Sequence, residues 1–311
     1  MNSLSDPVDS PDQFFGCPPA CGGSPDPAGL PLTMQGRSCW LDLRRPVIMG
    51  ILNVTPDSFF PGSRADSVDH ALARARRMLE EGADIIDVGG ESTRPGAVLV
   101  GEQEELDRVI PVIEALAGAV PCPLSIDTNK SNVARAAVAA GAEFVNDISG
   151  FAFDPDMADV VAACGAGAFL MHTRGKPANM QADTGYHDLL MEIMAYLQKA
   201  VQQAEAAGIP RSKLAIDPGI GFGKDLSGNL EILCRLREFH ALGLPVLLGT
   251  SRKNFIGQIV GQSDPAERLN GTLATVALGV ACGVQIFRVH DVRPAREAAL
   301  MAWAVVHRQL P

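Results

Sequence analysis

The sequence has no apolar run long enough to span a membrane, no basic stretch followed by an apolar one at residues 1–10, and no excess of positive charge. A transmembrane helix needs about 20 consecutive apolar residues, and a secretory signal needs a basic and then an apolar region. The net charge is −10, whereas a nucleic-acid backbone is bound by a basic face. We therefore expect no membrane or nucleic-acid partner, and an anionic substrate would be held by a local basic cluster.

Several common catalytic motifs are also missing. The sequence contains no Walker phosphate loop, no GxSxG nucleophile elbow and no HExxH zinc motif. Its seven cysteines are scattered, and an odd, scattered set suits a reducing compartment, so we expect a cytoplasmic protein. Cys17 and Cys21 form a lone CxxxC without a second pair or a nearby histidine. That isolation favours two loop thiols over a zinc site.

Residues 1–36 differ in composition from the rest of the chain. They hold seven of the 22 prolines, contain no Lys or Arg and show no periodicity. Such a segment cannot bury enough apolar surface to fold alone, so we predict a disordered tail. A short strand pair is expected near Cys39–Leu43, and residues 37–311 are predicted to form a single domain.

From Pro46 onward, short apolar runs alternate with longer amphipathic stretches, as in repeated βα units. Eight continuous apolar runs match the strand count of a (β/α)8 TIM barrel. An open doubly wound sheet would need a glycine-rich loop after its first strand, where Asn53-Val54-Thr55-Pro56 stands instead. The predicted strands are Val47–Val54, Asp84–Gly89, Pro123–Asp127, Phe144–Ile148, Ala168–His172, Lys213–Asp217, Pro245–Gly249 and Gln285–Val289. The predicted helices include Val68–Glu81, Glu102–Leu116, Asn132–Ala140, His187–Ala207, Asn229–Leu242, Pro265–Cys282 and Arg293–His307.

Nearly every predicted strand delivers a polar residue at its carboxyl end. In a TIM barrel these ends converge on one rim, where active sites lie. Asp and Asn can instead cap the helices that follow, but capping does not require Arg288 and His290. We therefore expect a site built from Asn53, Asp87, Asp127, Asn146, Asp147, His172, Asp217, Ser251, Arg288 and His290.

Two loops have the composition of anion-binding sites. Ser92-Thr93-Arg94 lies beside glycines, so hydroxyls, backbone N–H groups and a guanidinium can donate to a phosphate. Ser251-Arg252-Lys253 precedes a short helix predicted from Asn254, whose start favours a carboxylate or phosphate. An ordinary polar turn and a capped helix start are the alternatives.

Five motifs occur in a fixed order: GILNVTPDSF at residues 50–59, IIDVGGESTRPG at 85–96, DPGIGFGK at 217–224, SRK at 251–253 and RVHD at 288–291. On these motifs the chain resembles the dihydropteroate synthase family of pterin-binding TIM barrels, over roughly residues 47–308. The first two motifs are highly specific. Departures from the family pattern occur at Phe60-Pro61, Asn129 and Thr173, and none removes a pterin contact.

The resemblance implies a reaction, site residues and a metal. The arylamine of p-aminobenzoate would displace pyrophosphate from 6-hydroxymethyl-7,8-dihydropterin pyrophosphate, giving 7,8-dihydropteroate for folate biosynthesis without a covalent enzyme intermediate. The pterin would be held by Asp127, Asn146, Met171, Asp217, Phe222, Lys253 and Arg288, the last by stacking on the ring. Asn53, Thr93, Arg94, Arg288 and His290 would hold the pyrophosphate, with Mg²⁺ on Asn53. Phe59, Pro95, Ser251 and Lys253 would hold p-aminobenzoate, and catalysis would depend on Asn53, Arg94, Lys253, Arg288 and His290.

Two alternatives share a pterin-binding barrel. A methyltetrahydrofolate-dependent methyltransferase would keep counterparts of the pterin-binding carboxylates but has no reason to keep Arg94, Ser251, Lys253 and His290. A non-catalytic pterin-binding paralogue would lack turnover. The resemblance also implies a sulfonamide target and a homodimer formed through the late helices.

Overall fold

A computed structural model of the protein describes residue 29, residues 31–54 and residues 64–311. Phe59, Pro61 and the other residues of 55–63 lie outside these residues. So do Cys17, Cys21 and most of the predicted tail. Among the described residues, no helix combines the length and apolarity that crossing a membrane requires.

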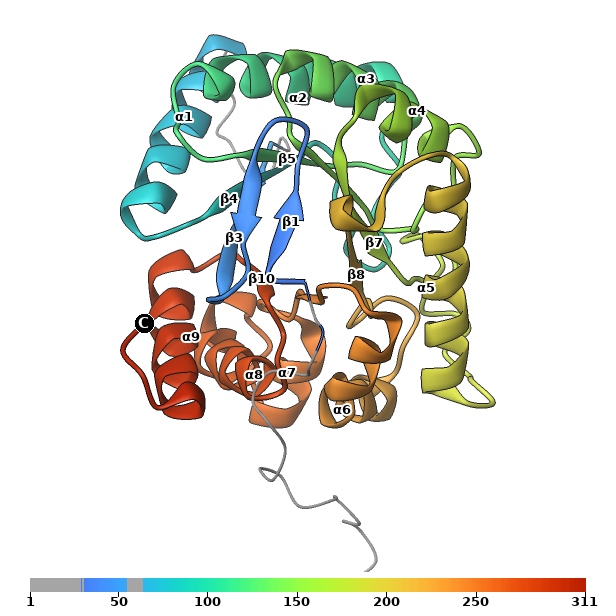
Figure 1. Cartoon of the computed structure of the whole chain (residues 1–311), viewed down its shortest axis with the longest axis vertical. Coiled ribbons are helices and arrows are strands. Elements are labelled where there is room, and N and C mark those ends of the chain that lie inside the picture. Colours follow the sequence, from blue (N-terminus) through green and yellow to red (C-terminus); the bar gives the residue numbers. More distant parts are fainter. Residues whose placement is uncertain (1–28, 30, 55–63) are drawn as a thin grey trace, which may run out of the picture.

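Eight parallel strands form the centre of the molecule (Figure 1). They are β3 (Val47–Asn53), β4 (Ile85–Gly89), β5 (Leu124–Asp127), β6 (Phe144–Asp147), β7 (Gly167–Met171), β8 (Leu214–Asp217), β9 (Leu247–Leu248) and β10 (Ile286–Val289). Their order is β8-β7-β6-β5-β4-β3-β10-β9. A parallel bridge from Ile216 to Val246, which directly precedes β9, brings the two edges together. The barrel and all eight predicted strands are confirmed.

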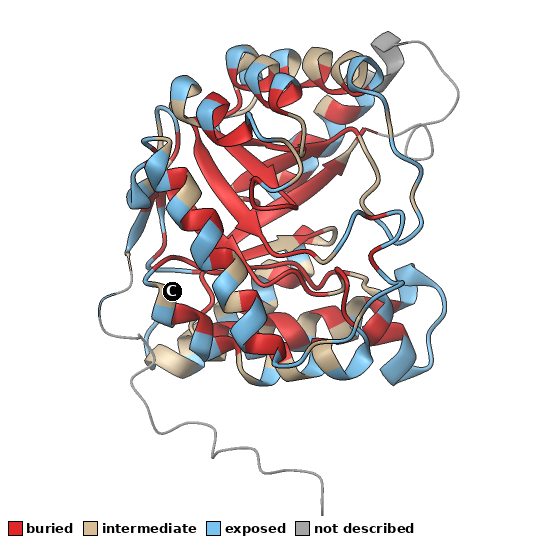
Figure 2. Cartoon of the chain, turned by 90° about the vertical axis from the view of Figure 1, so that its right-hand side faces the viewer, coloured by how far each residue is buried: buried red, intermediate tan, exposed pale blue. Residues whose placement is uncertain are grey.

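Helices follow each strand and surround the barrel (Figure 1). They are α1 (Arg64–Glu80), α2 (Glu102–Ala117), α3 (Ser131–Ala140), α4 (Met157–Cys164), α5 (Leu189–Ala206), α6 (Leu226–Cys234), α7 (Asn254–Val260), α8 (Leu269–Ala281) and α9 (Val292–His307). Two stretches that the sequence pattern predicted as single helices are α-helical only in part. A short 3-10 segment forms the end of the first, at Leu236–Leu242, and another forms the start of the second, at Pro265–Arg268. Figure 2 shows that the strands are buried and that the helices bury the face toward them.

Side chains along each strand alternate between two environments, as β geometry requires. In β4, Ile86 and Val88 join the large apolar cluster between strands and helices, whereas Ile85 joins a smaller cluster inside the barrel. The same alternation places Phe169 inside the barrel and Leu170 outside it. The interior residue nearest the carboxyl end of a strand therefore points toward the rim.

A hairpin closes the amino end of the barrel. Strands β1 (Thr33–Gln35) and β2 (Trp40–Asp42) pair antiparallel, and Met34 and Leu41 pack into the interior cluster. Glu143 fixes the turn by accepting the Ser38 N–H over 2.6 Å and the Ser38 hydroxyl over 2.5 Å. The prediction of a disordered tail as far as residue 36 is therefore wrong at its end, because Met34 is fully buried.

Candidate active site

Alternation along the strands brings several of the predicted polar residues into one interior layer. Val47, Phe144, Ala215 and Ile286 belong to the apolar floor of the barrel. Further along the same strands, an even number of residues on, lie the polar residues that face the carboxyl rim: Asn53, Asn146, Asp217 and Arg288. Asp87 and Asp127 have the same orientation on β4 and β5, since Ile85 and Ser125 precede them by two positions.

Arg288 lies at the centre of this layer and pairs with two carboxylates. Its Nε donates to Asp87 Oδ2 over 2.6 Å, and its Nη2 donates to Asp127 Oδ2 over 2.5 Å. Asn146 Nδ2 also donates to Asp87 Oδ2, over 3.0 Å. Two carboxylates thus fix the edge of the guanidinium. Asp87 was expected only as a polar strand end, and its role as the partner of Arg288 was missed; a carboxylate within the apolar strand Ile85–Gly89 was the available signal.

Asp217, Lys253 and Arg288 surround Gly249. A Cβ atom at Gly249 would lie 3.9 Å from Asp217 Oδ2, from Lys253 Nζ and from Arg288 Cβ. The Lys253 ammonium donates to the Ile220 carbonyl and lies 4.8 Å from the centre of the Phe222 ring. Asp217 Oδ1 accepts the Gly219 N–H over 2.7 Å. The absence of a side chain at position 249 leaves room beside a carboxylate and two cations.

Burial shifts the pKa values of these groups toward neutral pH. Desolvation raises the pKa of Asp127 to about 7, although Arg288 opposes the shift. It also raises the pKa of Asp217 against the attraction of Lys253, and it lowers the pKa of Lys253 to about 8. Asp87 Oδ1 and Asp127 Oδ1 are buried and accept no hydrogen bond from the residues that the structure describes. Buried acceptors without donors are costly, so this layer is arranged to receive donors from a ligand.

One wall of the site is apolar. Met171 and Phe222, both predicted to contact the pterin, are buried in one cluster with Ile148 and Met180, and Phe153 packs against it. The structure therefore brings the predicted pterin residues together: the polar set on β5, β6, β8 and β10, Lys253 between β9 and α7, and the apolar pair beside them. Concave sites that combine one apolar wall with a few placed polar groups are typical of small-molecule binding.

A second group of residues joins the loops after β9 and β10. Ser251 Oγ accepts the His290 backbone N–H over 3.1 Å and lies 3.0 Å from His290 Nδ1. Burial, followed by the charge of Arg288, lowers the pKa of His290 to about 3, so the imidazole is neutral near pH 7. Arg252 forms a two-pronged ion pair with Asp291, over 2.9 and 2.5 Å. One of the two cations in the SRK motif is therefore used within the protein.

The loop after β4 places the other predicted anion-binding residues. Thr93 is half-buried, whereas Arg94 and Pro95 are exposed. Arg94 contributes to the lowered pKa of His290, which puts its charge within electrostatic reach of that imidazole. At the loop tip, the Gly96 N–H donates to the Pro177 carbonyl over 3.0 Å. Asn53 lies at the neighbouring strand end, with its Oδ1 3.7 Å from where a Cβ at Gly89 would be.

Two expected rim residues have local structural roles. Asp147 accepts the N–H and hydroxyl of Ser149 and the N–H of Phe151, which stabilises the turn after β6. His172 Nδ1 lies 2.8 Å from the buried Lys224 ammonium. Lys224 also donates to two carbonyls of the loop that carries Phe222. A Cβ at Gly219 would lie 1.9 Å from the His172 carbonyl oxygen, so this loop requires glycine there.

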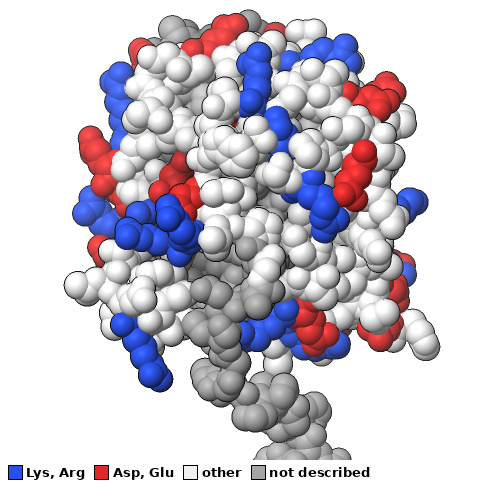
Figure 3. All heavy atoms as spheres, viewed as in Figure 1, with Lys and Arg blue, Asp and Glu red and all other residues white. Residues whose placement is uncertain are grey.

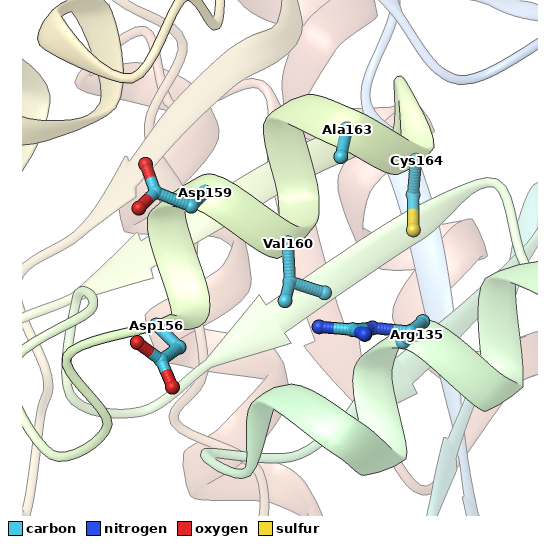
Figure 4. Close-up of a pocket in the computed structure, with 6 residues that line it drawn as sticks. All are labelled: Arg135, Asp156, Asp159, Val160, Ala163 and Cys164. Atoms are coloured by element: carbon cyan, nitrogen blue, oxygen red, sulfur yellow. The ribbon is translucent and has the colours of Figure 1, made fainter.

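Two surface hollows lie outside the interior layer, the second of them beside Phe153 of the apolar wall. One of about 470 Å³ runs between α3 and α4, and Figure 4 shows Arg135 of α3 extending toward Val160 of α4. A second, of about 290 Å³, is lined by loops that include Asn129, Lys130 and Lys176. On the face seen in Figure 3, basic and acidic side chains are interspersed, without a continuous basic area.

Comparison with known proteins gives consistent matches. The family model "Pterin binding enzyme" matches residues 49–290. The chain is 47% identical over 264 residues to a dihydropteroate synthase of Bacillus subtilis, covering 85% of this chain and 90% of the relative. Among solved structures, it is similar to the Yersinia pestis dihydropteroate synthase determined with a sulfonamide drug complex. The TM-score there is 0.83 and the identity 45%, over 88% of this chain and 98% of that one.

A second solved structure gives the same result. The Xanthomonas albilineans dihydropteroate synthase determined with 4-aminobenzoic acid matches with a TM-score of 0.83 and 42% identity, over 90% of this chain and 99% of that one. The resemblance that the sequence motifs indicated is thereby confirmed, and with it the barrel that the motifs implied. The chain belongs to the dihydropteroate synthase family of pterin-binding enzymes.

Proposed function

We propose that the protein condenses 6-hydroxymethyl-7,8-dihydropterin pyrophosphate with p-aminobenzoate to give 7,8-dihydropteroate and pyrophosphate. The observation that carries the proposal is the interior layer of Asp127, Asn146, Asp217, Lys253 and Arg288, with an unpaired Asp127 oxygen. A pterin edge presents several N–H donors and a carbonyl acceptor, which two carboxylates, an amide and an ammonium can satisfy together. Met171 and Phe222 would then contact the ring faces.

The reaction transfers an alkyl group. The arylamine nitrogen forms a bond to the pterin methylene carbon, the bond from that carbon to the pyrophosphate oxygen breaks, and the amine loses a proton. Positive charge that develops on the pterin is stabilised by buried carboxylates such as Asp127. The departing anion is stabilised by Arg94, Arg288 and a neutral His290, which can donate a hydrogen bond. A nucleophilic side chain is not needed, because binding both substrates aligns the reacting atoms.

The second substrate fits the group near β9. Ser251, at the start of the segment that leads into α7, would donate to the carboxylate of p-aminobenzoate, and Pro95 would contact the aryl ring. The similar Xanthomonas albilineans enzyme was determined with 4-aminobenzoic acid and the Yersinia pestis enzyme with a sulfonamide drug complex. We propose that sulfonamides occupy the same place here.

The proposal includes Mg²⁺. Among the described residues, no group of three or more His, Cys, Asp or Glu side chains is arranged to hold a metal. Mg²⁺ is usually bound by one or two protein oxygens together with substrate phosphates and water. Asn53 Oδ1, next to the predicted pyrophosphate residues, would be the protein ligand. When bound, the ion would neutralise charge on the departing pyrophosphate.

A turnover assay tests the proposed function. Purified protein is mixed with the pterin pyrophosphate, p-aminobenzoate and Mg²⁺, and pyrophosphate release and dihydropteroate are both measured. Stoichiometric formation of the two products is expected. Tight pterin binding without turnover would instead identify a non-catalytic paralogue, and methyl transfer from methyltetrahydrofolate would identify the other alternative.

We also propose a cytoplasmic homodimer formed through the late helices. Leu278 of α8 and Met301 and Val305 of α9 are each more than half exposed, and these two helices lie side by side (Figure 1). Apolar side chains gathered on adjacent helices are typical of an interface. Light scattering after size-exclusion chromatography should give twice the chain mass, and Met301→Glu with Val305→Glu should give the monomer mass.

A further inference from the structure

A buried ion-pair cluster lies beneath the predicted pyrophosphate-binding loop and outside the residues assigned to the substrates. Lys130 Nζ donates to Glu91 Oε2 and to Glu105 Oε2, each over 2.5 Å. The Glu105 side chain is fully buried, and that of Glu91 is 8% exposed. The cluster connects three segments: the loop after β4, helix α2 and the loop after β5.

Glu91 uses both of its carboxylate oxygens at the base of the loop. While Oε2 accepts from Lys130, Oε1 accepts the backbone N–H of Val100 over 3.1 Å. One side chain thus joins the two ends of residues 91–100, the segment that contains Thr93 and Arg94. Arg108 of α2 adds an anchor by donating to the Gly90 carbonyl over 2.7 Å. The course of the loop that carries Arg94 is therefore determined by the contacts at its base.

The same cluster connects this loop to the interior layer proposed to hold the pterin, called the pterin layer below, which consists of Asp127, Asn146, Asp217, Lys253 and Arg288. Lys130 follows Asp127 by three residues, and its backbone N–H donates to Thr128 Oγ1 over 3.3 Å. The Thr128 N–H in turn donates to the Asn146 carbonyl over 3.1 Å. Through Lys130, the position of Glu91 is fixed relative to the strand ends that would hold the pterin.

We propose that Glu91 is a positioning residue for the pyrophosphate-binding loop: it sets where Thr93 and Arg94 stand relative to the pterin layer. The inference deepens the proposed function and rests on it. Charge-assisted hydrogen bonds in a buried setting hold a defined geometry, and a displacement of about 1 Å can reduce catalysis by roughly a hundredfold. Loss of the Glu91 contacts should weaken interactions with the pyrophosphate and spare those with a pterin that lacks it.

Two variants and three measurements test the proposal. Glu91→Gln removes the charge, and Glu91→Asp keeps the charge but withdraws it by one methylene. For each variant we would measure the inhibition constant of pyrophosphate in the presence of Mg²⁺, the dissociation constant of 6-hydroxymethylpterin, and amide hydrogen exchange across residues 92–101. We expect pyrophosphate to bind roughly ten- to a hundredfold more weakly, the pterin to bind as in the wild type, and exchange in the loop to accelerate.

Arg296→Met provides a matched control. Arg296 forms a partly buried ion pair with Asp84 over 2.8 Å, from α9 to the start of β4 at the opposite end of the barrel. Its loss should lower the melting temperature without changing pyrophosphate affinity. Unchanged pyrophosphate affinity in both folded Glu91 variants, or an equal loss for the pterin, would overturn the positioning role. A wild-type protein that turns over no substrate would contradict the proposed function and not this inference, which the exchange measurement tests separately.

Discussion

Ser251 and His290 are in hydrogen-bond contact, with Ser251 Oγ 3.0 Å from His290 Nδ1. The contact joins the residue assigned to the p-aminobenzoate carboxylate to a residue assigned to the departing pyrophosphate. The two substrate sites are therefore expected to share one polar connection rather than to act independently.

Ser251→Ala should weaken binding of both p-aminobenzoate and pyrophosphate. A lost hydrogen bond is worth about 0.5–1.5 kcal/mol, so each dissociation constant should rise by roughly two- to tenfold. Calorimetric titration with each ligand in the presence of Mg²⁺ measures this. Ser227→Ala, on the exposed start of α6, is the control. A loss confined to one ligand would show that the contact does not connect the sites.

Lys253→Ala and Asp217→Ala should each lose pterin affinity. Asp217 is buried and Lys253 is half-buried, both beside Gly249, and removing a charged hydrogen-bond partner costs about 1.5–3 kcal/mol. Titration of 6-hydroxymethylpterin into the folded variants gives the loss, with Lys199→Ala on the exposed face of α5 as the control. Wild-type affinity in both variants would place the pterin elsewhere.

Pterin affinity should pass through a maximum between about pH 7 and 8. The ligand's donors require an ionised Asp127, whose raised pKa of about 7 means that affinity is lost as the pH falls below that value. The ligand's carbonyl acceptor requires a protonated Lys253, whose lowered pKa of about 8 means that affinity is lost as the pH rises above it. Dissociation constants measured from pH 5.5 to 9 should rise by up to about tenfold per unit on each side. A flat profile would contradict both assignments.

The hairpin should be required for stability, in contrast to the segment before it. A chain that begins at Pro31 retains Met34, whereas a chain that begins at Arg37 loses it and exposes the interior cluster. Met34→Ala should cost about 2–5 kcal/mol of unfolding free energy. Urea unfolding of these three proteins would test this; equal stability of all three would mean that the hairpin does not support the barrel.

Sulfonamides should compete with p-aminobenzoate and not with the pterin pyrophosphate. They present an arylamine and a polar sulfonyl group of similar spacing, which suits the place assigned next to Ser251 and Pro95. Steady-state inhibition patterns against each substrate distinguish the sites. Competition against the pterin would show that the second site has been placed wrongly.

The barrel could be predicted because its signal is local. Each strand is a short apolar run, and each ends in a polar residue such as Asp127 or Asp217, so the rim follows from topology alone. The hairpin could be predicted only in part. A strand pair was expected near Cys39–Leu43, where β2 lies, but β1 falls within the predicted tail. A strand of three residues has no measurable periodicity, and Met34 is buried because it packs into the interior cluster of the barrel.

Pairings between residues far apart in the chain could not be predicted from the sequence either. Arg288 pairs with Asp87 across 201 positions, and Lys130 with Glu91 across 39. Nothing in the sequence indicated which charged residues would pair with each other. Asp147 was predicted at the rim for the same reason as Asp127, yet it stabilises a turn. Only the surrounding loops decide whether a carboxylate at a strand end faces a ligand or its own backbone.

Because the β1–β2 hairpin closes the amino end of the barrel, the interior opens only at the carboxyl rim. The pterin layer lies deep, with Asp127 and Asn146 buried, while Pro95 and Arg94 stand at the opening. A molecule seated in the deep layer can leave only past whatever occupies the opening. If the substrates bind as proposed, we expect an ordered reaction: the pterin binds before the arylamine, and the pyrophosphate leaves before the dihydropteroate.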